Sequence, residues 1–322
     1  MAVYTHLAAE ELAELIGEYD VGRLVSAKGI AEGVSNSNWL VETTQGRFIL
    51  TLYERRIDNR DLPFFLGLLD HLSAKGSPVP RTIHDRSGAA YRMVGNKAAA
   101  LIEFLPGVSI ERPTPAQARA VGAALAGIHL AARDFDRSRN NELGPQAWRE
   151  LLEECGDEAL ASIDPSLPAL VRSELELFAE QWPTDLPAGV IHADLFPDNV
   201  LMIGNEVRGL IDFYFACNDF FAYDLAVTHA AWCFTGDDEF QAEVSAALMT
   251  GYEAIRPLTE AERNALPLLA RGASMRFLST RAYDWLHTPA DALVTRKDPM
   301  AFARRLSFYQ TQGDSAFKSG TD

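Results

Sequence analysis

The stretch VIHADLFPDNVLMIGNEVRGLIDFYF, residues 190–215, constrains this chain more than any other. It sets a His and several Asp and Asn residues among strongly apolar ones. That mixture costs free energy unless the polar groups are paired, solvated in a cleft or bound to a cation. Short apolar runs predict strands on either side of a loop and then of a hairpin turn. Asp194, Asn199 and Asp212 then lie at a loop, a strand start and a strand end, where they can converge.

An Asp and an Asn a few loop residues apart, followed after a hairpin by an Asp at a strand end, suit phosphoryl transfer from a nucleotide. Asp194 would orient the attacking hydroxyl and accept its proton, while Asn199 and Asp212 would supply oxygen ligands for Mg²⁺ on the phosphates. Taken singly, each Asp is more often a turn former with a solvated carboxylate. The joint spacing H-x-D-x-x-x-x-N, then apolar-Asp-Phe, favours a kinase-type site.

The segments HADLFPDN and LIDFY resemble the catalytic and metal-binding loops of the aminoglycoside-phosphotransferase-like kinases, usually HGDLHPGN followed by IDF or IDW. Together with GVSNSNWLVETTQGRFILTLYERR and GLIDFYFACNDFFAYDLA, nearly the whole chain resembles the bacterial homoserine kinases of this superfamily. The resemblance implies ATP with Mg²⁺ as phosphoryl donor and L-homoserine as acceptor, on the route to threonine. Ala193, Phe196 and Asp198 depart from the general pattern. A kinase of choline, hydroxylysine, methylthioribose or an aminoglycoside therefore stays open.

The resemblance also implies a bilobal α+β, protein-kinase-like fold. Residues 1–103 would form a nucleotide-binding lobe, an antiparallel β-sheet with a helix, and residues 104–322 a larger, mainly α-helical lobe for catalysis and substrate binding. Sequence patterns agree, because alternating apolar residues predict a five-stranded antiparallel sheet in the first part and helical spacing dominates the second. Helices are predicted at 5–16 and 61–74, and ligands are expected between the lobes.

The glycine-rich turn at 29–38 occupies the position of a kinase nucleotide-binding loop. Glycines and small polar residues let backbone N–H groups approach phosphates closely, although an ordinary long hairpin is the alternative. Extended backbone after the last strand of the sheet is expected to hydrogen-bond the adenine edge. The nucleotide-binding residues predicted here are Gly33, Val34, Ser35, Asn36, Glu103 and Leu105.

One expected element is missing from the third strand. Kinases of this type place a Lys there to hold the α- and β-phosphates, paired with a Glu on the next helix. Thr51 falls about where that Lys would be, and the helix at 61–74 offers no Glu. Arg55 is predicted to reach the phosphates instead, while Arg56 is as well explained as a solvated surface residue. The missing Lys also leaves open a catalytically silent kinase-like binding protein, which the intact catalytic motif disfavours.

Three residues are predicted to line the substrate site. Arg139, on a polar loop, would hold a substrate carboxylate because a guanidinium fork matches that group, although an exposed loop Arg is more often only solubilising. Asp219 has aromatic neighbours that would keep the site partly dry, so it suits the substrate ammonium. Asp198 is assigned to the same site.

Two further residues are predicted to support the catalytic loop. His192 begins the loop, and Asp224 would cap the following helix or bind a loop N–H group. His129, on an apolar helix, is expected to be a hydrogen-bonded core histidine rather than a ligand.

The charge balance limits the partners of this chain. It carries 29 Lys and Arg against 45 Asp and Glu, a net charge of −16, which repels nucleic acid and anionic membranes. No long apolar run or signal peptide is evident. Three cysteines fit neither a metal site nor a disulfide framework. We therefore expect a cytoplasmic monomer or homodimer without nucleic-acid or membrane partners.

Overall fold

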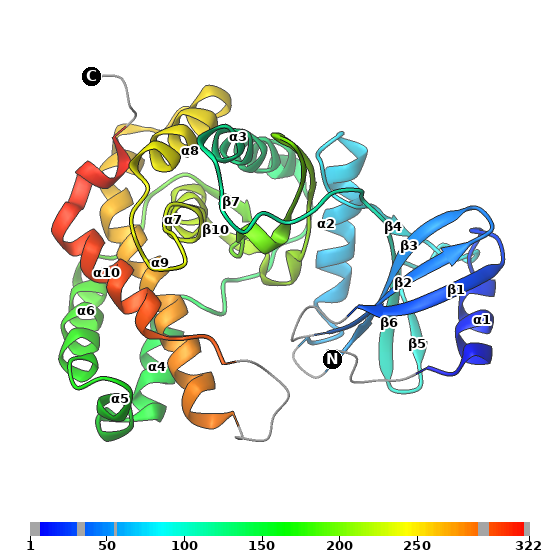
Figure 1. The fold of residues 1–322 in the computed structure, drawn as a ribbon, viewed down its shortest axis with the longest axis horizontal. Coiled ribbons are helices and arrows are strands. Elements are labelled where there is room, and N and C mark those ends of the chain that lie inside the picture. Colours follow the sequence, from blue (N-terminus) through cyan, green and yellow to red (C-terminus); the bar gives the residue numbers. More distant parts are fainter. Residues whose placement is uncertain (1–6, 31–35, 55–56, 289–295, 319–322) are drawn as a thin grey trace.

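The computed structural model describes residues 7–30, 36–54, 57–288 and 296–318. Figure 1 shows an N-terminal part built on a sheet and a larger remainder that is mostly helical. This is the α+β architecture expected from the sequence. Helix α2 (Leu62–Ala74) lies between the sheet and the helical part.

The N-terminal sheet is antiparallel and has six strands rather than the expected five. The additional strand, β4, has only two residues and follows a segment with two prolines. It is too short for an alternation of apolar and polar residues to predict it. The order is β1-β2-β3-β6-β4, with β5 also paired to β6. The strands are β1 (Leu24–Ile30), β2 (Asn36–Thr43), β3 (Gly46–Tyr53), β4 (Thr82–Ile83), β5 (Arg92–Val94) and β6 (Lys97–Glu103).

Each face of this sheet buries a different apolar cluster. Helix α1 (Ala9–Gly17) starts at Ala9 rather than near residue 5, because the Glu11 carboxylate accepts a hydrogen bond from the Ala8 N–H at 2.8 Å and so caps the helix there. Its apolar stripe packs against Trp39 and Leu50 in the smaller cluster. The other face packs on α2, which belongs to a larger cluster continuing through the helical part.

The helical part is organised around α7 (Phe221–Trp232), every residue of which is buried. Short antiparallel pairs join β7 (Ala188–Ile191) to β10 (Cys217–Phe220) and β8 (Val200–Ile203) to β9 (Glu206–Leu210). The other helices are α3 (Pro115–Ala131), α4 (Pro145–Cys155), α5 (Asp157–Ile163), α6 (Leu167–Gln181), α8 (Ala242–Ile255), α9 (Glu260–His287) and α10 (Met300–Gln312).

Helices α3 and α8 approach one another at glycines. A Cβ atom on Gly122 of α3 would lie 2.2 Å from the carbonyl oxygen of Leu248, and one on Gly251 of α8 would lie 2.0 Å from that of Arg119. No other residue type fits at either position without moving a helix.

The connection from the sheet to the helices is fastened to the β8–β9 hairpin. Backbone hydrogen bonds join Val108 and Met202 in both directions, at 3.1 and 2.9 Å. A Cβ atom on Gly209 of β9 would lie 2.7 Å from Cδ1 of Leu105. Asn199 precedes this hairpin and Asp212 follows it, so the connection and the catalytic motif are held together.

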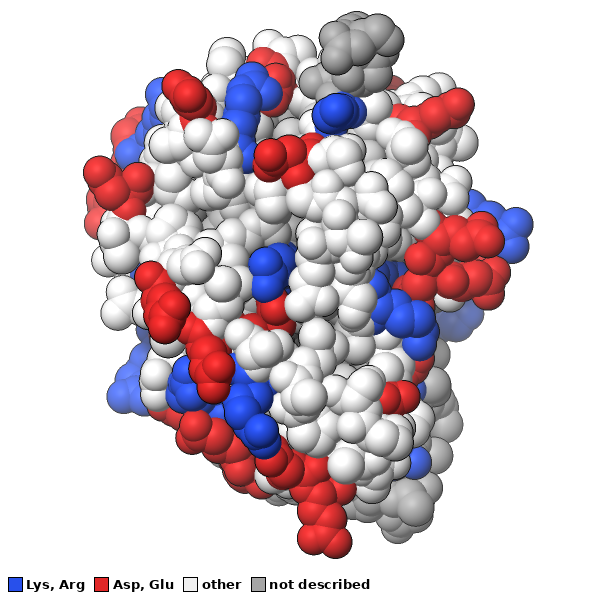
Figure 2. Space-filling model, turned by 90° about the vertical axis from the view of Figure 1, so that its left-hand side faces the viewer, with Lys and Arg blue, Asp and Glu red and all other residues white. Residues whose placement is uncertain are grey.

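One face of the molecule carries its charge in a dispersed form (Figure 2). Figure 2 shows acidic and basic side chains in small mixed groups on one face of the helical part, rather than one continuous acidic field. Within the described ranges, none of the helices combines the length and apolar character that crossing a membrane requires.

Candidate active site

Asp224 of α7 holds the loop between β7 and β8 in place through hydrogen bonds to the loop backbone. This residue lies within α7 and does not cap it, and its carboxylate accepts hydrogen bonds from the backbone N–H groups of His192 and Ala193, both at 2.7 Å. Ala193 has a φ of 63°, a left-handed conformation that a non-glycine residue adopts only when its surroundings impose it. Nε2 of His129 lies 2.9 Å from the same carboxylate. Burial favours protonation, but the hydrogen bond and charge of His129 lower the pKa of Asp224.

His192 ties the catalytic loop to the end of β9. Its Nδ1 accepts the Asp194 N–H at 3.2 Å, so Nε2 carries the proton and donates to the carbonyl of Ile211 at 3.0 Å. Ile211 directly precedes Asp212, and its own N–H donates to the Asn199 carbonyl at 3.0 Å. Two strand ends are thereby locked in register.

These contacts bring Asp194, Asn199 and Asp212 together, as the sequence predicted. Nδ2 of Asn199 donates to the carbonyl of Asp194 at 2.8 Å and to its Oδ2 at 3.3 Å. The amide oxygen of Asn199 is therefore the end presented to a further partner. Asp212 adopts the left-handed conformation, φ 65° and ψ 56°, where the strand gives way to the next turn.

Burial, together with neighbouring carboxylates, raises the pKa values of Asp194 and Asp212. Burial raises the pKa of Asp194, whose side chain is 17% exposed, to about 7; Arg276 opposes this, and the charges of Asp212 and Asp198 add to it. The side chain of Asp212 is exposed. The protein around it still removes enough water to raise the pKa of Asp212 to about 6; the charge of Asp198 adds to this rise and the charge of Lys297 opposes it. Such a cluster is stabilised by a bound cation.

Arg276 of α9 reaches the catalytic loop, which the sequence did not indicate. Its guanidinium donates to the carbonyl of Ala193, and NH2 lies 3.8 Å from Oδ1 of Asp194. The side chain is buried, with the rings of Phe215 and Phe277 at 5.3 and 4.7 Å. Its apolar neighbours along the helix were the available signal, because an Arg that is buried among such residues has to be paired.

The strand expected to carry a kinase Lys presents other groups instead. Thr51 donates to Oδ1 of Asn38 at 2.8 Å. Two residues along β3, the hydroxyl of Tyr53 lies 3.2 Å from that of Tyr214, in the turn after Asp212. Strand β3 and the turn after Asp212 are thus joined by two hydroxyl groups rather than by a charged pair.

The predicted nucleotide-binding residues are only partly described. Gly33, Val34, Ser35 and Arg55 lie outside the described residues. Asn36 begins β2 and is buried, with Oδ1 3.4 Å from the Glu54 nitrogen. Glu103 ends β6, where its N–H donates to the Arg81 carbonyl at 3.0 Å, and Leu105 packs on the β8–β9 hairpin.

The predicted substrate residues lie in different settings. Asp198 is exposed on the catalytic loop. Asp219 in β10 accepts from Nδ2 of Asn141 at 2.7 Å, and burial raises the pKa of Asp219. Nε of Arg139 is 2.8 Å from the Asp61 carboxylate.

Arg139 is further committed to its own surroundings. A second nitrogen of its guanidinium contacts Glu142, and its plane lies 5.3 Å from the Phe65 ring. It lines a pocket of about 380 Å³ that Asp61 and Tyr214 also border. A substrate carboxylate would have to compete with two protein carboxylates for this side chain.

Comparison with known proteins places the whole chain among phosphotransferases. Residues 26–258 match the model of a phosphotransferase enzyme family. A homoserine kinase of Gluconobacter oxydans is 52% identical over 97% of this chain and 99% of its own length. A homoserine kinase of Methylobacterium radiotolerans is 51% identical over 98% of each chain.

Solved structures share the fold at lower identity. A spectinomycin phosphotransferase in complex with ADP and spectinomycin gives a TM-score of 0.74 at 14% identity, covering 96% of this chain and 100% of that one. A microcompartment-associated aminopropanol kinase gives 0.67 at 19% identity, covering 97% and 100%.

Proposed function

Because the chain belongs to the phosphotransferase enzyme family, we propose that it transfers the γ-phosphoryl group of ATP to the side-chain hydroxyl of L-homoserine. The product is O-phospho-L-homoserine, an intermediate of threonine biosynthesis. The observation that carries the choice of substrate is the 52% identity to a homoserine kinase across 97% of the chain.

Asp194 orients the γ-hydroxyl of homoserine and accepts its proton as the oxygen attacks phosphorus. The support for this role is its position in a loop held by Asp224 from α7 and by Arg276 from α9. A carboxylate fixed in this way contributes by positioning as well as by taking the proton.

The oxygen donors of the site fit a divalent cation, which we take to be Mg²⁺. The amide nitrogen of Asn199 is occupied by Asp194, so its oxygen is available together with the Asp212 carboxylate. Among the described residues, no three His, Cys, Asp or Glu side chains could hold a metal by themselves. Ligands from the nucleotide phosphates are therefore needed, as is usual for Mg²⁺. The cation would neutralise the charge of the phosphates.

The nucleotide is proposed to lie where the sheet meets the β8–β9 hairpin. Backbone groups from Glu103 to Leu105 would contact adenine, and the division between lobes would fall after Glu103. The roles of Gly33, Val34, Ser35, Asn36 and Arg55 at the phosphates stay predictions from the sequence.

The substrate ammonium is assigned to Asp219, and Asp198 is assigned to the same substrate site. Asp219 is partly buried and close to the catalytic loop through the pairing of β10 with β7. The sequence predicted Arg139 as a ligand of the substrate carboxylate, but its guanidinium already contacts Asp61 and Glu142. We expect a cytoplasmic monomer or homodimer without nucleic-acid or membrane partners.

The decisive experiment is ADP release from Mg·ATP by the purified chain, with L-homoserine, choline, hydroxylysine, methylthioribose and kanamycin offered in parallel. We expect a high kcat/KM for homoserine alone. Turnover of another alcohol in its place would overturn the substrate while keeping the phosphotransferase reaction. No turnover with any of them would favour a silent binding protein.

A further inference from the structure

An aromatic cluster borders the catalytic loop on the side of α9 and α10. Phe196 of the loop lies 4.8 Å from Phe277 of α9 and 6.2 Å from Phe302 of α10, between ring centroids. Phe277 and Phe302 are themselves 4.9 Å apart. The three rings therefore form one aromatic cluster, and Phe196 lies two residues after Asp194 in the loop.

A positively charged side chain lies over each ring of this cluster, where the negative face of the ring attracts it. These cations face the carboxylates of Asp194 and Asp212. The pairs are Arg276 with Phe277 at 4.7 Å, Arg281 and Arg305 with Phe302 at 4.5 and 4.6 Å, and Lys297 with Phe196 at 5.9 Å.

These cations differ in how far other groups of the protein already bind them, and Arg305 is held by Asp238. Arg276 is buried against the catalytic loop. Arg281 donates to the backbone carbonyl of Asp298 at 3.2 Å. Lys297 is exposed, and its charge acts on both Asp194 and Asp212. Its ammonium group is therefore the cation beside the reacting centre that is most open to a ligand.

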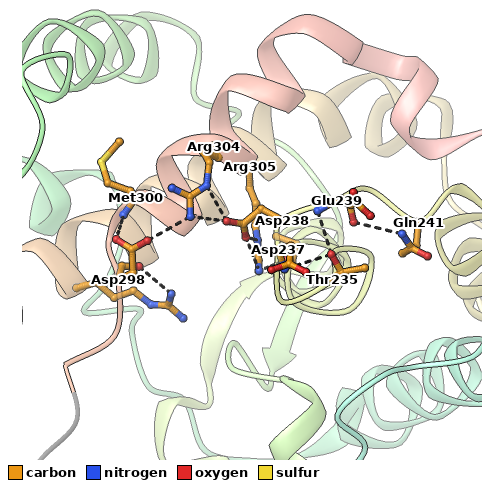
Figure 3. A network of polar contacts seen from close by, with 11 residues as sticks. Thr235, Asp237, Asp238, Glu239, Gln241, Asp298, Met300, Arg304 and Arg305 are labelled. Carbon is orange, nitrogen blue, oxygen red and sulfur yellow. Dashed lines mark hydrogen bonds and ion pairs between the residues drawn. The ribbon is translucent and has the colours of Figure 1, made fainter.

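The backbone next to Lys297 is held in place by Asp298, which Figure 3 shows within a charged network. One carboxylate oxygen of Asp298 accepts the Met300 N–H at 2.9 Å, and the other accepts from Arg304 at 3.2 Å. With the bond from Arg281, the residue following Lys297 is fixed at three points.

The same network is anchored in the core through Asp238. This carboxylate is 5% exposed and binds Arg304 at 2.7 Å and Arg305 at 3.1 Å. Arg305 also donates to the carbonyl of Ala230 in α7 at 2.8 Å. Lys297 thus projects from a segment tied to the helix that supports the catalytic loop.

Homoserine differs from simple amino alcohols by its α-carboxylate, and recognising that group requires a cation. Arg139 is engaged by Asp61 and Glu142, whereas Lys297 is exposed beside Asp194. Building on the function proposed above, we propose that Lys297 binds the α-carboxylate of the amino-acid substrate. It thereby selects an amino acid over alcohols that lack this group. Arg281 adds positive charge behind it.

The test compares Lys297→Met with the wild type, using ligands that carry or lack the carboxylate. L-Homoserine is the substrate, and 4-hydroxybutyrate and 3-aminopropan-1-ol are competing ligands that retain only the carboxylate or only the amine. We expect kcat/KM for homoserine to fall about 10- to 100-fold through KM, as for loss of a hydrogen bond to a charged group. The inhibition constant of 4-hydroxybutyrate should rise similarly, while that of 3-aminopropan-1-ol and the KM of ATP stay unchanged.

Two further variants sharpen the result. Lys297→Arg keeps the charge and should restore most of the homoserine affinity, and Lys318→Met makes the same substitution at an exposed lysine after α10 and should behave as wild type. Equal losses for both competing ligands, or an effect confined to the KM of ATP, would overturn the carboxylate assignment. A wild-type chain inactive on homoserine would instead overturn the proposed function itself.

Discussion

The hydroxyl oxygens of Tyr53 and Tyr214 lie 3.2 Å apart, which joins strand β3 to the turn that follows Asp212. Their rings meet edge to face at 5.3 Å, and Phe65 of α2 packs on Tyr214 at 5.8 Å. In kinases of this type a Lys–Glu pair joins the same strand and helix. Here aromatic contacts and one hydroxyl pair link the strand, the helix and the turn after Asp212.

Removing the hydroxyl of either Tyr53 or Tyr214 should abolish the interaction between the two side chains. We expect Tyr53→Phe and Tyr214→Phe each to lower the free energy of unfolding by about 1 kcal/mol, as for a typical buried hydrogen bond. The double variant should lose less than the sum of the two, by about 0.5 kcal/mol or more. Denaturant titration of the four proteins measures the coupling, and strict additivity would show that the two hydroxyls act independently.

Asp194→Asn should abolish catalysis without removing nucleotide binding. The amide keeps the shape of the side chain but cannot accept the proton, so kcat should fall by about 10²- to 10⁴-fold or more. The affinity for Mg·ATP should change only a few fold, as measured by calorimetry. Asp164→Asn, at an exposed turn, is the matched control. A variant with near-normal kcat would remove Asp194 as the base.

Asp224→Asn should disturb the catalytic loop from beneath. Its carboxylate is met by the N–H groups of His192, Ala193 and His129, and an amide would turn an N–H toward one of these donors. We expect a loss of about 3 kcal/mol in the free energy of unfolding together with a lower kcat. If the folded variant kept its full kcat, the loop would not depend on this carboxylate.

Acid should destabilise the protein through His229. Its imidazole is bonded to Tyr309 and Ser245 at 2.6 and 2.8 Å, and burial lowers the pKa of His229 to about 3. An unfolded His titrates near pH 6.5. Below that pH the unfolded chain takes up a proton that the folded chain refuses until about pH 3. Stability is therefore lost as pH falls through this window, by up to about 1.4 kcal/mol per pH unit.

The comparison variant for this window is His229→Gln, which has no titrating group. It should be less stable at pH 7 but lose less on going to pH 5, by about 2 kcal/mol. Free energies of unfolding at the two pH values measure this difference. Parallel losses in both proteins would place the acid sensitivity elsewhere.

The close approach of α3 and α8 predicts opposite effects for two alanine substitutions in one helix. Gly122→Ala would press a methyl group on the Leu248 carbonyl and should cost about 3 kcal/mol. Gly127→Ala meets nothing within 4 Å and should stabilise by up to about 1 kcal/mol, since Ala favours the helix more than Gly. Thermal unfolding separates the two, and equal melting temperatures would contradict the packing described here.

The sequence predicted the centre of the site because Asp194, Asn199 and Asp212 belong to one loop and one hairpin. The loop and the hairpin place them near one another along the chain, and the bonds from Asp224 and His192 then fix the loop. Arg276 and Lys297 come from much further along the chain, and only the packing of α9 and α10 beside the loop makes them neighbours of Asp194. The spacing of apolar residues in the sequence does not predict a contact between residues so far apart along the chain.

The same distinction applies to the fold. Longer strands and amphipathic helices were predictable from their patterns, whereas β4 is set by its pairing with β6 rather than by its own two residues. Asp224 precedes an apolar helical run, so the sequence predicted either a helix cap or a bond to a loop N–H group. Only the structure, which buries α7 on all sides, shows that it supports the loop. Contacts decided both cases.

All six strands of the sheet and both of its flanking helices precede residue 104. The cluster beneath α1 is made wholly from this part, while the cluster beneath α2 needs residues from the helical part. On the ribosome, one face of the sheet can therefore be completed while the other still exposes the apolar side of α2. Until α3 and the catalytic loop have emerged, we expect the nascent chain to aggregate through that face and chaperones to bind it there.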